Sequence, residues 1–234
     1  MAISFNTNSI SETIQTLFDL SDSVKKVASG NYIFREGDQG VEIYLIKSGI
    51  VRLSKHNGDG MELNLRICKT NDLMGELTLF KDDIQYFLSA KAMTPVEVYV
   101  IKKDKLEKSI LSNPAIAKDF IVWFNMHFRK TQTKFRDLVL YGKKGAVYST
   151  IIRMTNSYGK MQRDGSILID LPLTNQELAN FCGGTRESVN RLLSELKKQN
   201  VISVTSGYIT VHKLDFLKNE IMCEGCPKEI CCID

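Results

Sequence analysis

The chain has 234 residues, of which 43% are hydrophobic and 25% are charged, and its formal net charge is +4. These values are ordinary for a globular protein of one large or two smaller domains, and they exclude a chain without a packed core. No apolar run approaches the roughly 18 residues of a membrane-spanning helix, and the N-terminus carries no secretory signal, so we expect a cytoplasmic protein with reduced thiols.

The charge is unevenly divided along the chain. Residues 1–120 carry 15 Lys/Arg against 16 Asp/Glu, whereas residues 121–222 carry 15 against 8. This basic excess predicts that the second half faces a polyanion such as DNA, although a merely lysine-decorated surface would give the same balance.

Short strands separated by glycine-bearing turns are predicted between Tyr32 and Ile101. The stretch 61–68 alternates in hydrophobicity, which places Met61, Leu63, Leu65 and Ile67 on one face and Cys68 on the polar face. Many short strands at this spacing indicate a closed two-sheet β-barrel of the jelly-roll type, which we assign to residues 1–111.

Three motifs of this region, Phe34-Arg-Glu-Gly-Asp38, Tyr44-Leu-Ile-Lys-Ser-Gly49 and Asp72-Leu-Met-Gly-Glu-Leu-Thr-Leu-Phe80, resemble the cyclic-nucleotide-binding barrel of the CRP/FNR family. In members that bind cyclic AMP, a Gly-Glu pair, matched here by Gly75 and Glu76, contacts the ribose, and a later arginine holds the phosphate. The stretch 81–91 has no arginine, and Asp82 and Asp83 would repel a phosphate. We therefore expect a barrel that binds no cyclic nucleotide, in which Gly75 and Glu76 form a structural turn.

A long helix is predicted next, because Asn113 and Pro114 form a start signal and the pattern continues to about Leu140 without Gly or Pro. Such a helix could pack on the barrel, but its length and aromatic content favour a two-chain interface. In the family that the chain resembles, this element pairs two subunits. We assign residues 112–141 to a dimerisation helix that ends at Gly142. Its apolar stripe consists of Ile116, Phe120, Trp123, Phe124, Phe128, Phe135 and Leu138.

The segment 173–193 predicts a helix-turn-helix, with a helix over 175–181, a turn at Gly183-Gly184 and a second helix capped by Thr185. A hairpin wing with Gly207 in its turn follows over 200–211, and Cys182 is expected in the core. Arginine can read guanine and glutamate can accept from cytosine in a major groove. The exposed residues at the start of the second helix are Arg186, Glu187, Asn190 and Arg191.

This segment resembles the DNA-binding domain of the CRP/FNR family, and Arg-Glu-Ser-Val-Asn-Arg resembles the recognition pattern of members that prefer TGTGA-like half-sites. The resemblance implies that residues 142–216 form a winged helix-turn-helix. A homodimer would then bind a palindrome in double-stranded DNA.

The segment 217–234 is a cysteine-rich extension that contains Cys223, Cys226, Cys231 and Cys232. Thiols this dense in a reducing compartment point to iron–sulfur or zinc, with thiol–disulfide switching as an alternative. The spacing Cys-x-x-Cys-x-x-x-x-Cys resembles the Fnr branch of the family in bacilli. The resemblance implies one [4Fe-4S] cluster per subunit, held by Cys223, Cys226, Cys231 and an aspartate that corresponds to Asp137.

Other assignments stay open for this extension. A zinc site could use all four thiols, Cys232 could replace Cys231 or Asp137 as a ligand, and Asp137 could be a plain surface carboxylate.

The predicted architecture is α+β, with a barrel, a dimerisation helix and a winged helix-turn-helix. We expect an oxygen-responsive, anaerobic transcription regulator and activator that works with RNA polymerase and does not act at a membrane. An iron–sulfur enzyme is disfavoured because the chain has no dinucleotide-binding fingerprint and its three histidines are widely spread. The alternative is a regulator controlled by a small ligand in the barrel, with structural zinc in the extension.

Overall fold

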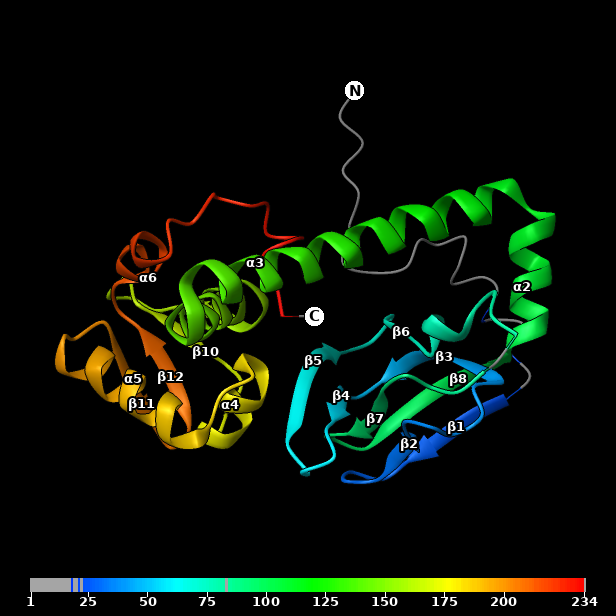
Figure 1. The fold of residues 1–234 in the computed structure, drawn as a ribbon, viewed down its shortest axis with the longest axis horizontal. Helices are drawn as coiled ribbons and strands as arrows, with labels where there is room; N and C mark the ends of the chain where they lie inside the picture. The colour runs from blue at the N-terminus through cyan, green and yellow to red at the C-terminus, as the bar shows by residue number, and fades with distance from the viewer. Residues whose placement is uncertain (1–17, 19–20, 22, 83, 234) are drawn as a thin grey trace. The chain divides into compact units, whose positions relative to one another are not determined.

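The computed structural model describes residues 18, 21, 23–82 and 84–233. They fall into two compact units, one built from the residues up to 60 together with 65–126, the other from 127–233 together with 61–64. Figure 1 traces the elements in chain order, and each unit is described by itself. No helix in the described part of the chain is long and apolar enough to cross a membrane.

The first unit is built on two four-stranded sheets with the orders β1-β8-β3-β6 and β2-β7-β4-β5. Side chains from both sheets meet in one core that includes Ile46, Leu53, Ala90 and Val98. The predicted two-sheet β-domain is therefore confirmed. Its strands are β1 (Ser23–Val27), β2 (Tyr32–Phe34), β3 (Glu42–Ser48), β4 (Val51–His56), β5 (Glu62–Cys68), β6 (Leu73–Met74), β7 (Ser89–Ala92) and β8 (Val96–Lys102).

The prediction for residues 61–68 is wrong in its choice of faces. In β5 the side chains of Asn64, Ile67 and Cys68 are buried, whereas Leu63 is exposed. The alternation is interrupted between Asn64 and Ile67, so Cys68 lies in the barrel core and not on a polar face. β5 is an edge strand, where an irregularity disturbs pairing on one side only.

Two helices follow the barrel, α2 (Lys103–Ser112) and α3 (Pro114–Tyr158), and the start of α3 packs on the first unit. The Oδ1 of Asn113 accepts a hydrogen bond from the backbone N of Ala115 at 3.0 Å, as the predicted cap requires. Ile116, Phe120 and Trp123 are buried in a core with residues of β3, β8 and α2. The predicted stripe is therefore split, because these three residues pack on the barrel while its last three members, from Phe128 onward, are exposed.

Gly142 divides α3 into two helices, residues 114–141 and residues 143–158. Its φ of 60° and ψ of −153° are not helical, and a positive φ favours glycine. Gly145 serves a different purpose, because a Cβ there would lie 2.5 Å from the backbone oxygen of Asp137. The absence of a side chain at Gly145 thus lets the two helices approach closely.

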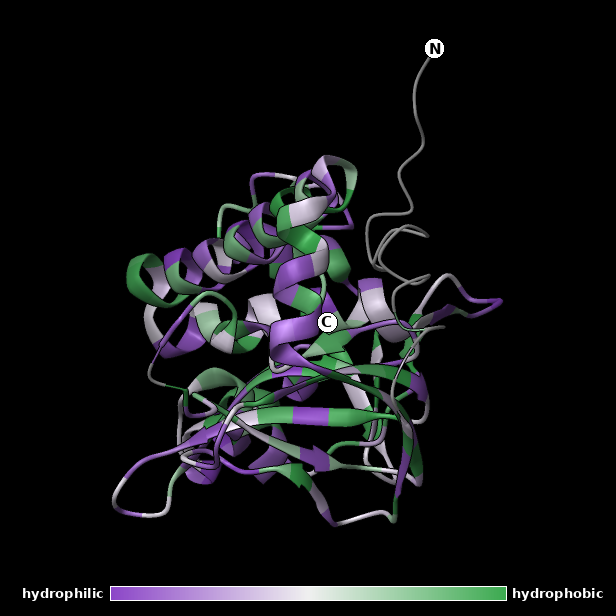
Figure 2. Cartoon of the chain, turned by 90° about the vertical axis from the view of Figure 1, so that its right-hand side faces the viewer, coloured by the Kyte–Doolittle hydropathy of each residue, from purple (hydrophilic) through white to green (hydrophobic). Residues whose placement is uncertain are grey.

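The second unit continues from the helix 143–158 into a sheet with the order β11-β12-β10-β9. β11 and β12 form the predicted wing, where Ser206 and Gly207 both have positive φ, as a type I′ turn requires. Figure 2 shows green and purple residues alternating along the helices, as expected of amphipathic elements. The elements are β9 (Gly159–Met161), β10 (Ile167–Ile169), α4 (Asn175–Cys182), α5 (Arg186–Lys198), β11 (Ile202–Thr205), β12 (Tyr208–Val211) and α6 (Leu214–Glu220).

Candidate functional site

The first candidate site is the helix pair α4 and α5, which the sequence fixes by two capping boxes. Thr174 with Glu177 caps α4, and Thr185 with Ser188 caps α5. Gly183 ends α4 with a φ of 59°, a conformation that favours glycine. The angle between the helices is filled by buried apolar side chains. The buried set is Leu178, Val189, Leu193 and Leu196.

The residues predicted to read DNA lie on the exposed surface of the first two turns of α5. Arg186, Glu187 and Arg191 are exposed, so their side chains are available to a partner. Asn190 is also exposed, but its Oδ1 accepts a hydrogen bond from Nδ2 of Asn175 at 3.1 Å. It therefore ties α5 to α4 as well as facing outward. The start of α5 therefore presents arginine and glutamate side chains, which can hydrogen-bond to the edges of bases.

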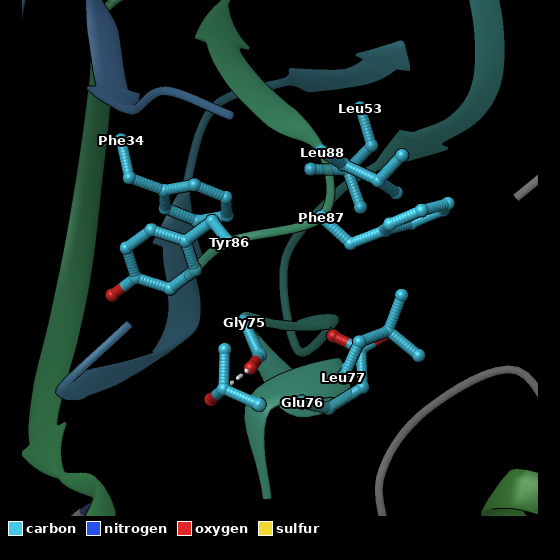
Figure 3. Close-up of a pocket in the computed structure, with 9 residues that line it drawn as sticks. Phe34, Leu53, Gly75, Glu76, Leu77, Tyr86, Phe87 and Leu88 are labelled. Carbon is cyan, nitrogen blue, oxygen red and sulfur yellow. Dashed lines mark hydrogen bonds between the residues drawn. The ribbon is translucent and has the colours of Figure 1, made fainter. Parts of the chain in front are cut away.

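The second candidate site is a small hollow in the barrel, whose cavity volume of about 20 Å³ is far below the roughly 300–1,000 Å³ of typical small-molecule pockets. It is lined by Phe34, Leu53, Phe87 and Leu88, by Tyr86 and by the turn at residues 75–78. In Figure 3 the rings of Phe34 and Tyr86 lie stacked above Gly75 and Glu76. Tyr86 belongs to the stretch 81–91, which contains no arginine, and its ring occupies space inside the barrel.

Glu76 is buried in this site and is engaged by the protein itself. Its Oε1 accepts a hydrogen bond from Nη1 of Arg66 at 3.0 Å. Burial raises the pKa of Glu76, and the charge of Arg66 opposes the rise. Gly75 precedes it with a φ of 87°, in a left-handed turn. Asp82 is exposed, whereas Asp83 lies outside the described residues.

The third candidate site is the cysteine-rich extension. All six cysteines of the chain are described as free thiols, and Cys223, Cys226 and Cys231 are partly exposed while Cys232 is buried. Burial raises the pKa of the Cys231 thiol, Arg153 opposes the rise, and the neighbouring thiols of Cys223 and Cys226 add to it. The three predicted cysteine ligands therefore share one electrostatic neighbourhood.

Asp137 adjoins this neighbourhood, but it is not a plain surface carboxylate, because only 1% of the residue is exposed. Its Oδ1 accepts from Nε and Nη2 of Arg136, at 3.1 and 2.8 Å, and its Oδ2 accepts from Nη2 of Arg153 at 2.6 Å. Arg136 also pairs with Glu224, next to Cys223. Burial lowers the pKa of Arg136, but the hydrogen bond to Asp137 and the negative charges of Asp137, Glu224 and Cys226 together outweigh this effect, so the pKa is raised.

These donors fit an iron–sulfur cluster by chemistry, since the extension carries three partly exposed free thiols, and Arg136 and Arg153 connect it to a buried carboxylate. A carboxylate has about four lone-pair positions, and three hydrogen bonds to Asp137 leave one of them for a metal. Within the described residues, no three side chains of His, Cys, Asp or Glu are already gathered at metal-binding distance. The extension would have to close around the metal.

Arg136 and Arg153 are the functional residues that sequence reasoning missed. A signal for Arg153 was present, because it stands alone among charges in the buried run Ala146–Thr155 and so needs an acidic partner. Arg136 gave no comparable signal, since its position on a helix surface looks like that of any solvated arginine.

Two family models match the chain. One, described as a cyclic nucleotide-binding domain, covers residues 24–113, and the other, described as a Crp-like helix-turn-helix domain, covers residues 146–220.

Among curated relatives, the "Anaerobic regulatory protein" of Bacillus subtilis is 50% identical over 96% of this chain and 94% of that protein. The "CRP-like cAMP-activated global transcriptional regulator" of Mycobacterium tuberculosis is 30% identical over 78% of this chain and 80% of that protein. Among solved structures, a CooA mutant from Carboxydothermus hydrogenoformans has a TM-score of 0.74 at 17% identity, covering 91% of this chain and 95% of that one.

Proposed function

The chain belongs to the CRP/FNR family of DNA-binding transcription regulators, and from this premise we propose that it responds to oxygen and regulates transcription under anaerobic conditions. Its relatives are regulators and not enzymes. The name of the Bacillus subtilis relative supports the anaerobic part of the proposal. We further propose that it acts in the cytoplasm as an activator that works with RNA polymerase.

The proposed ligands of one [4Fe-4S] cluster per subunit are Cys223, Cys226, Cys231 and Asp137. The observation that carries this assignment is the buried Asp137, which is joined through Arg153 to the backbone of Ile230, next to Cys231, and through Arg136 to Glu224, next to Cys223. Such a cluster, when bound, would supply the oxygen-labile chemistry of the sensor. The chain's own contribution is a mixed donor set, in which a carboxylate is a weaker partner for iron than a thiolate.

A four-thiolate zinc site agrees less well with the observed positions of the thiols than does a cluster held by three cysteines and one aspartate. A four-thiolate zinc site would need Cys232, whose Sγ is buried and donates to the backbone oxygen of Glu229 at 3.3 Å. The side chain of Cys232 would have to leave this position to reach a shared metal.

DNA recognition is proposed for Arg186, Glu187, Asn190 and Arg191, with α5 in a major groove. Two exposed arginines separated by more than one helical turn can contact successive bases, and Glu187 between them can accept from cytosine. This arrangement supports a palindrome of TGTGA-like half-sites.

A homodimer, typical of the family, is supported by the exposed apolar residues of α3. Five exposed or partly exposed apolar residues recur, together with Thr131, at a strict heptad spacing, which is the pattern of a helix seam that pairs with a second helix. Because the seam is exposed, a second copy of the chain can bury it. The seam positions are Ile121, Phe124, Phe128, Thr131, Phe135 and Leu138, among which only Phe124 is partly buried.

Cyclic nucleotide binding is not part of the proposed function. Tyr86 and Phe34 stack at 4.0 Å between ring centroids, and Glu76 is already paired with Arg66. A cyclic phosphate would find no arginine in the stretch 81–91. Titration calorimetry with cyclic AMP should therefore give no heat of binding at micromolar ligand, and a measurable heat would overturn this part.

The test of the proposal is anaerobic purification of the full chain, followed by iron and sulfide analysis, a visible spectrum and DNA binding before and after exposure to air. We expect about four irons and four sulfides per subunit, an absorbance that air bleaches, and weaker specific binding afterwards. Single changes of Cys223, Cys226 or Cys231 to Ala should abolish the absorbance, while Cys232→Ala should preserve it. Colourless, zinc-loaded protein from iron-replete anaerobic cells would contradict the proposal.

A further inference from the structure

Arg153 touches the two chain segments that flank the cysteine site. Its Nη2 donates to Oδ2 of Asp137 at 2.6 Å, and its Nη1 donates to the backbone oxygen of Ile230 at 3.3 Å. Asp137 lies before the break at Gly142, whereas Arg153 belongs to the helix after it. One buried guanidinium, on a residue that is 3% exposed, therefore joins both parts of α3 to the extension.

The same helix holds the extension by two further polar contacts. Nδ2 of Asn156 donates to the backbone oxygen of Cys231 at 2.6 Å, and Oγ of Ser157 accepts from the backbone N of Ile233 at 3.0 Å. Residues 153, 156 and 157 share one helix face, because they are three and four positions apart. We call these three residues the docking face.

The docking face holds the extension through the backbone atoms of residues 230, 231 and 233, and Asn156 also hydrogen-bonds to the thiol of Cys231. Ile230, Cys232 and Ile233 of the docked segment are buried, so the segment withdraws apolar surface from water in addition to making the hydrogen bonds. The preceding stretch 222–229 contains five exposed residues and is held at its start, where the backbone N of Cys223 donates to the oxygen of Lys218 at 2.9 Å. Cys231 is thus on an anchored segment, while Cys226 is on the exposed stretch between two anchors.

We propose that Arg153 is the positioning residue that keeps residues 230–233 on the helix 143–158 when no metal is bound, and that transmits ligation of the cysteines to the DNA-binding unit. The second half of this inference rests on the proposed function, but the first half does not. Ligation would then restrain mainly the stretch 222–229 against Asp137, while the end at 230–233 stays docked throughout. Arg153 holds Asp137 and the anchored end together, so a restraint on either one reaches the helix that opens the DNA-binding unit.

The first test measures amide hydrogen exchange on the full-length, metal-free protein, comparing the original chain with Arg153→Lys. Lysine keeps the positive charge but loses the planar fork that reaches both partners. We expect residues 230–233 to be protected in the original chain and to exchange at least about tenfold faster in Arg153→Lys, as for the loss of one buried hydrogen bond. Arg163→Lys is the matched control, because Arg163 is exposed on the β9–β10 turn, and it should change nothing.

Ser157→Ala keeps the test decisive if Arg153→Lys unfolds, since it leaves the buried Arg153 in place, removes the acceptor of the Ile233 amide and should accelerate exchange at that amide. Exchange of residues 230–233 at the rate of an unstructured peptide in the original chain would overturn the proposal. So would equal exchange in the original chain and both docking-face variants.

The second test compares specific DNA affinity of the metal-loaded and metal-free states. Arg153→Lys should retain the iron content and spectrum of the original chain. The ratio of DNA affinities in the metal-loaded and metal-free states should, however, be smaller by about tenfold or more than in the original chain. An unchanged difference, with full iron content, would make Arg153 structural only and overturn its transmitting role. If the original chain binds no iron yet protects residues 230–233, the proposed function fails while the docking stands.

Discussion

Cys182 and the extension's cysteines have the same side chain in different surroundings. Cys182 is 4% exposed, and its Sγ lies 3.5 Å from the backbone oxygen of Ala146 and 3.6 Å from Oγ1 of Thr150. Burial raises the pKa of its thiol from 9.0 to about 12, against the opposing effect of the Thr150 hydrogen bond. A thiol that stays protonated is a poor nucleophile and metal ligand, so Cys182 is the core residue that the sequence predicted.

Cys182 should make the protein less stable as the pH rises above 9. The unfolded thiol ionises through its ordinary pKa of 9.0 while the folded thiol stays protonated to about 12, so protons favour the folded state. The free energy of unfolding should fall within this window by a slope that approaches about 1.4 kcal/mol per pH unit. Urea denaturation of the original chain and Cys182→Ala at several pH values measures this slope. Parallel slopes for the two proteins would contradict the prediction.

Asp137 should be essential for stability even without metal. Asp137→Asn keeps the shape of the side chain but leaves the buried Arg153 without its carboxylate, which should cost about 3–5 kcal/mol of unfolding free energy. The matched control is Asp215→Asn, whose side chain is 92% exposed, with an expected change within about 0.5 kcal/mol. Urea denaturation of metal-free protein provides the comparison. Similar costs for the two variants would show that the buried pair contributes little.

At the scale of elements, local signals predicted most of the fold and long-range packing decided the rest. The caps Thr174 and Thr185 and the turn at Gly183 made the helix-turn-helix predictable, because each acts within a few residues. The periodicity of α3 did not distinguish packing on the barrel from packing on a second chain, so Ile116 and Trp123 were assigned to the wrong surface. Both surfaces are apolar, and only the tertiary structure separates them.

In the candidate sites, too, only features that are local in the sequence could be predicted. The extension's cysteines were visible as a spacing, whereas the role of Arg153 depends on partners 16 and 77 residues away in the chain. No local pattern encodes such a pairing. The sequence left open whether Asp137 is a plain surface carboxylate, and its burial beside two arginines removes that alternative.

The heptad seam can be tested by comparing two apolar residues of equal exposure. Phe135 is 66% exposed on the seam, and Leu140 is 64% exposed on the opposite side of the heptad. Phe135→Ala should weaken the dimer by about 2 kcal/mol or more, roughly 30-fold in Kd, as for the loss of an interface anchor. Leu140→Ala should leave the dimer unchanged. Sedimentation equilibrium measures both, and equal effects would argue for a different interface.

At the scale of the whole molecule, the uneven distribution of charge predicts that the two halves of the chain contribute differently to DNA binding. The basic excess lies in residues 121–222, which include α5 and its exposed arginines, while the barrel half is nearly neutral. Affinity for DNA phosphates should therefore come from the second unit, and choice of sequence from the few side chains at the start of α5.

This division predicts separate effects of salt and of Glu187. The logarithm of the association constant should fall linearly with the logarithm of salt, with a slope of about −0.9 for each phosphate contacted. Glu187→Gln should leave that slope unchanged but reduce discrimination at one base pair by about 1–3 kcal/mol. Glu195→Gln, later on the exposed surface of α5, is the control. Fluorescence anisotropy with matched and mismatched duplexes separates the effects, and a uniform loss for Glu187→Gln would mark it as structural.

The position of Arg153 in the chain also orders events during synthesis. Asp137 precedes Arg153 by 16 residues, whereas Ile230 follows it by 77. At about 5–20 residues per second, the ribosome completes Ile230 roughly 4–15 s after Arg153. The nascent helix pair can therefore close its Asp137–Arg153 ion pair while the docking face is still empty. The cysteine segment can reach this face only seconds later, after the winged helix-turn-helix up to residue 216 has been synthesised.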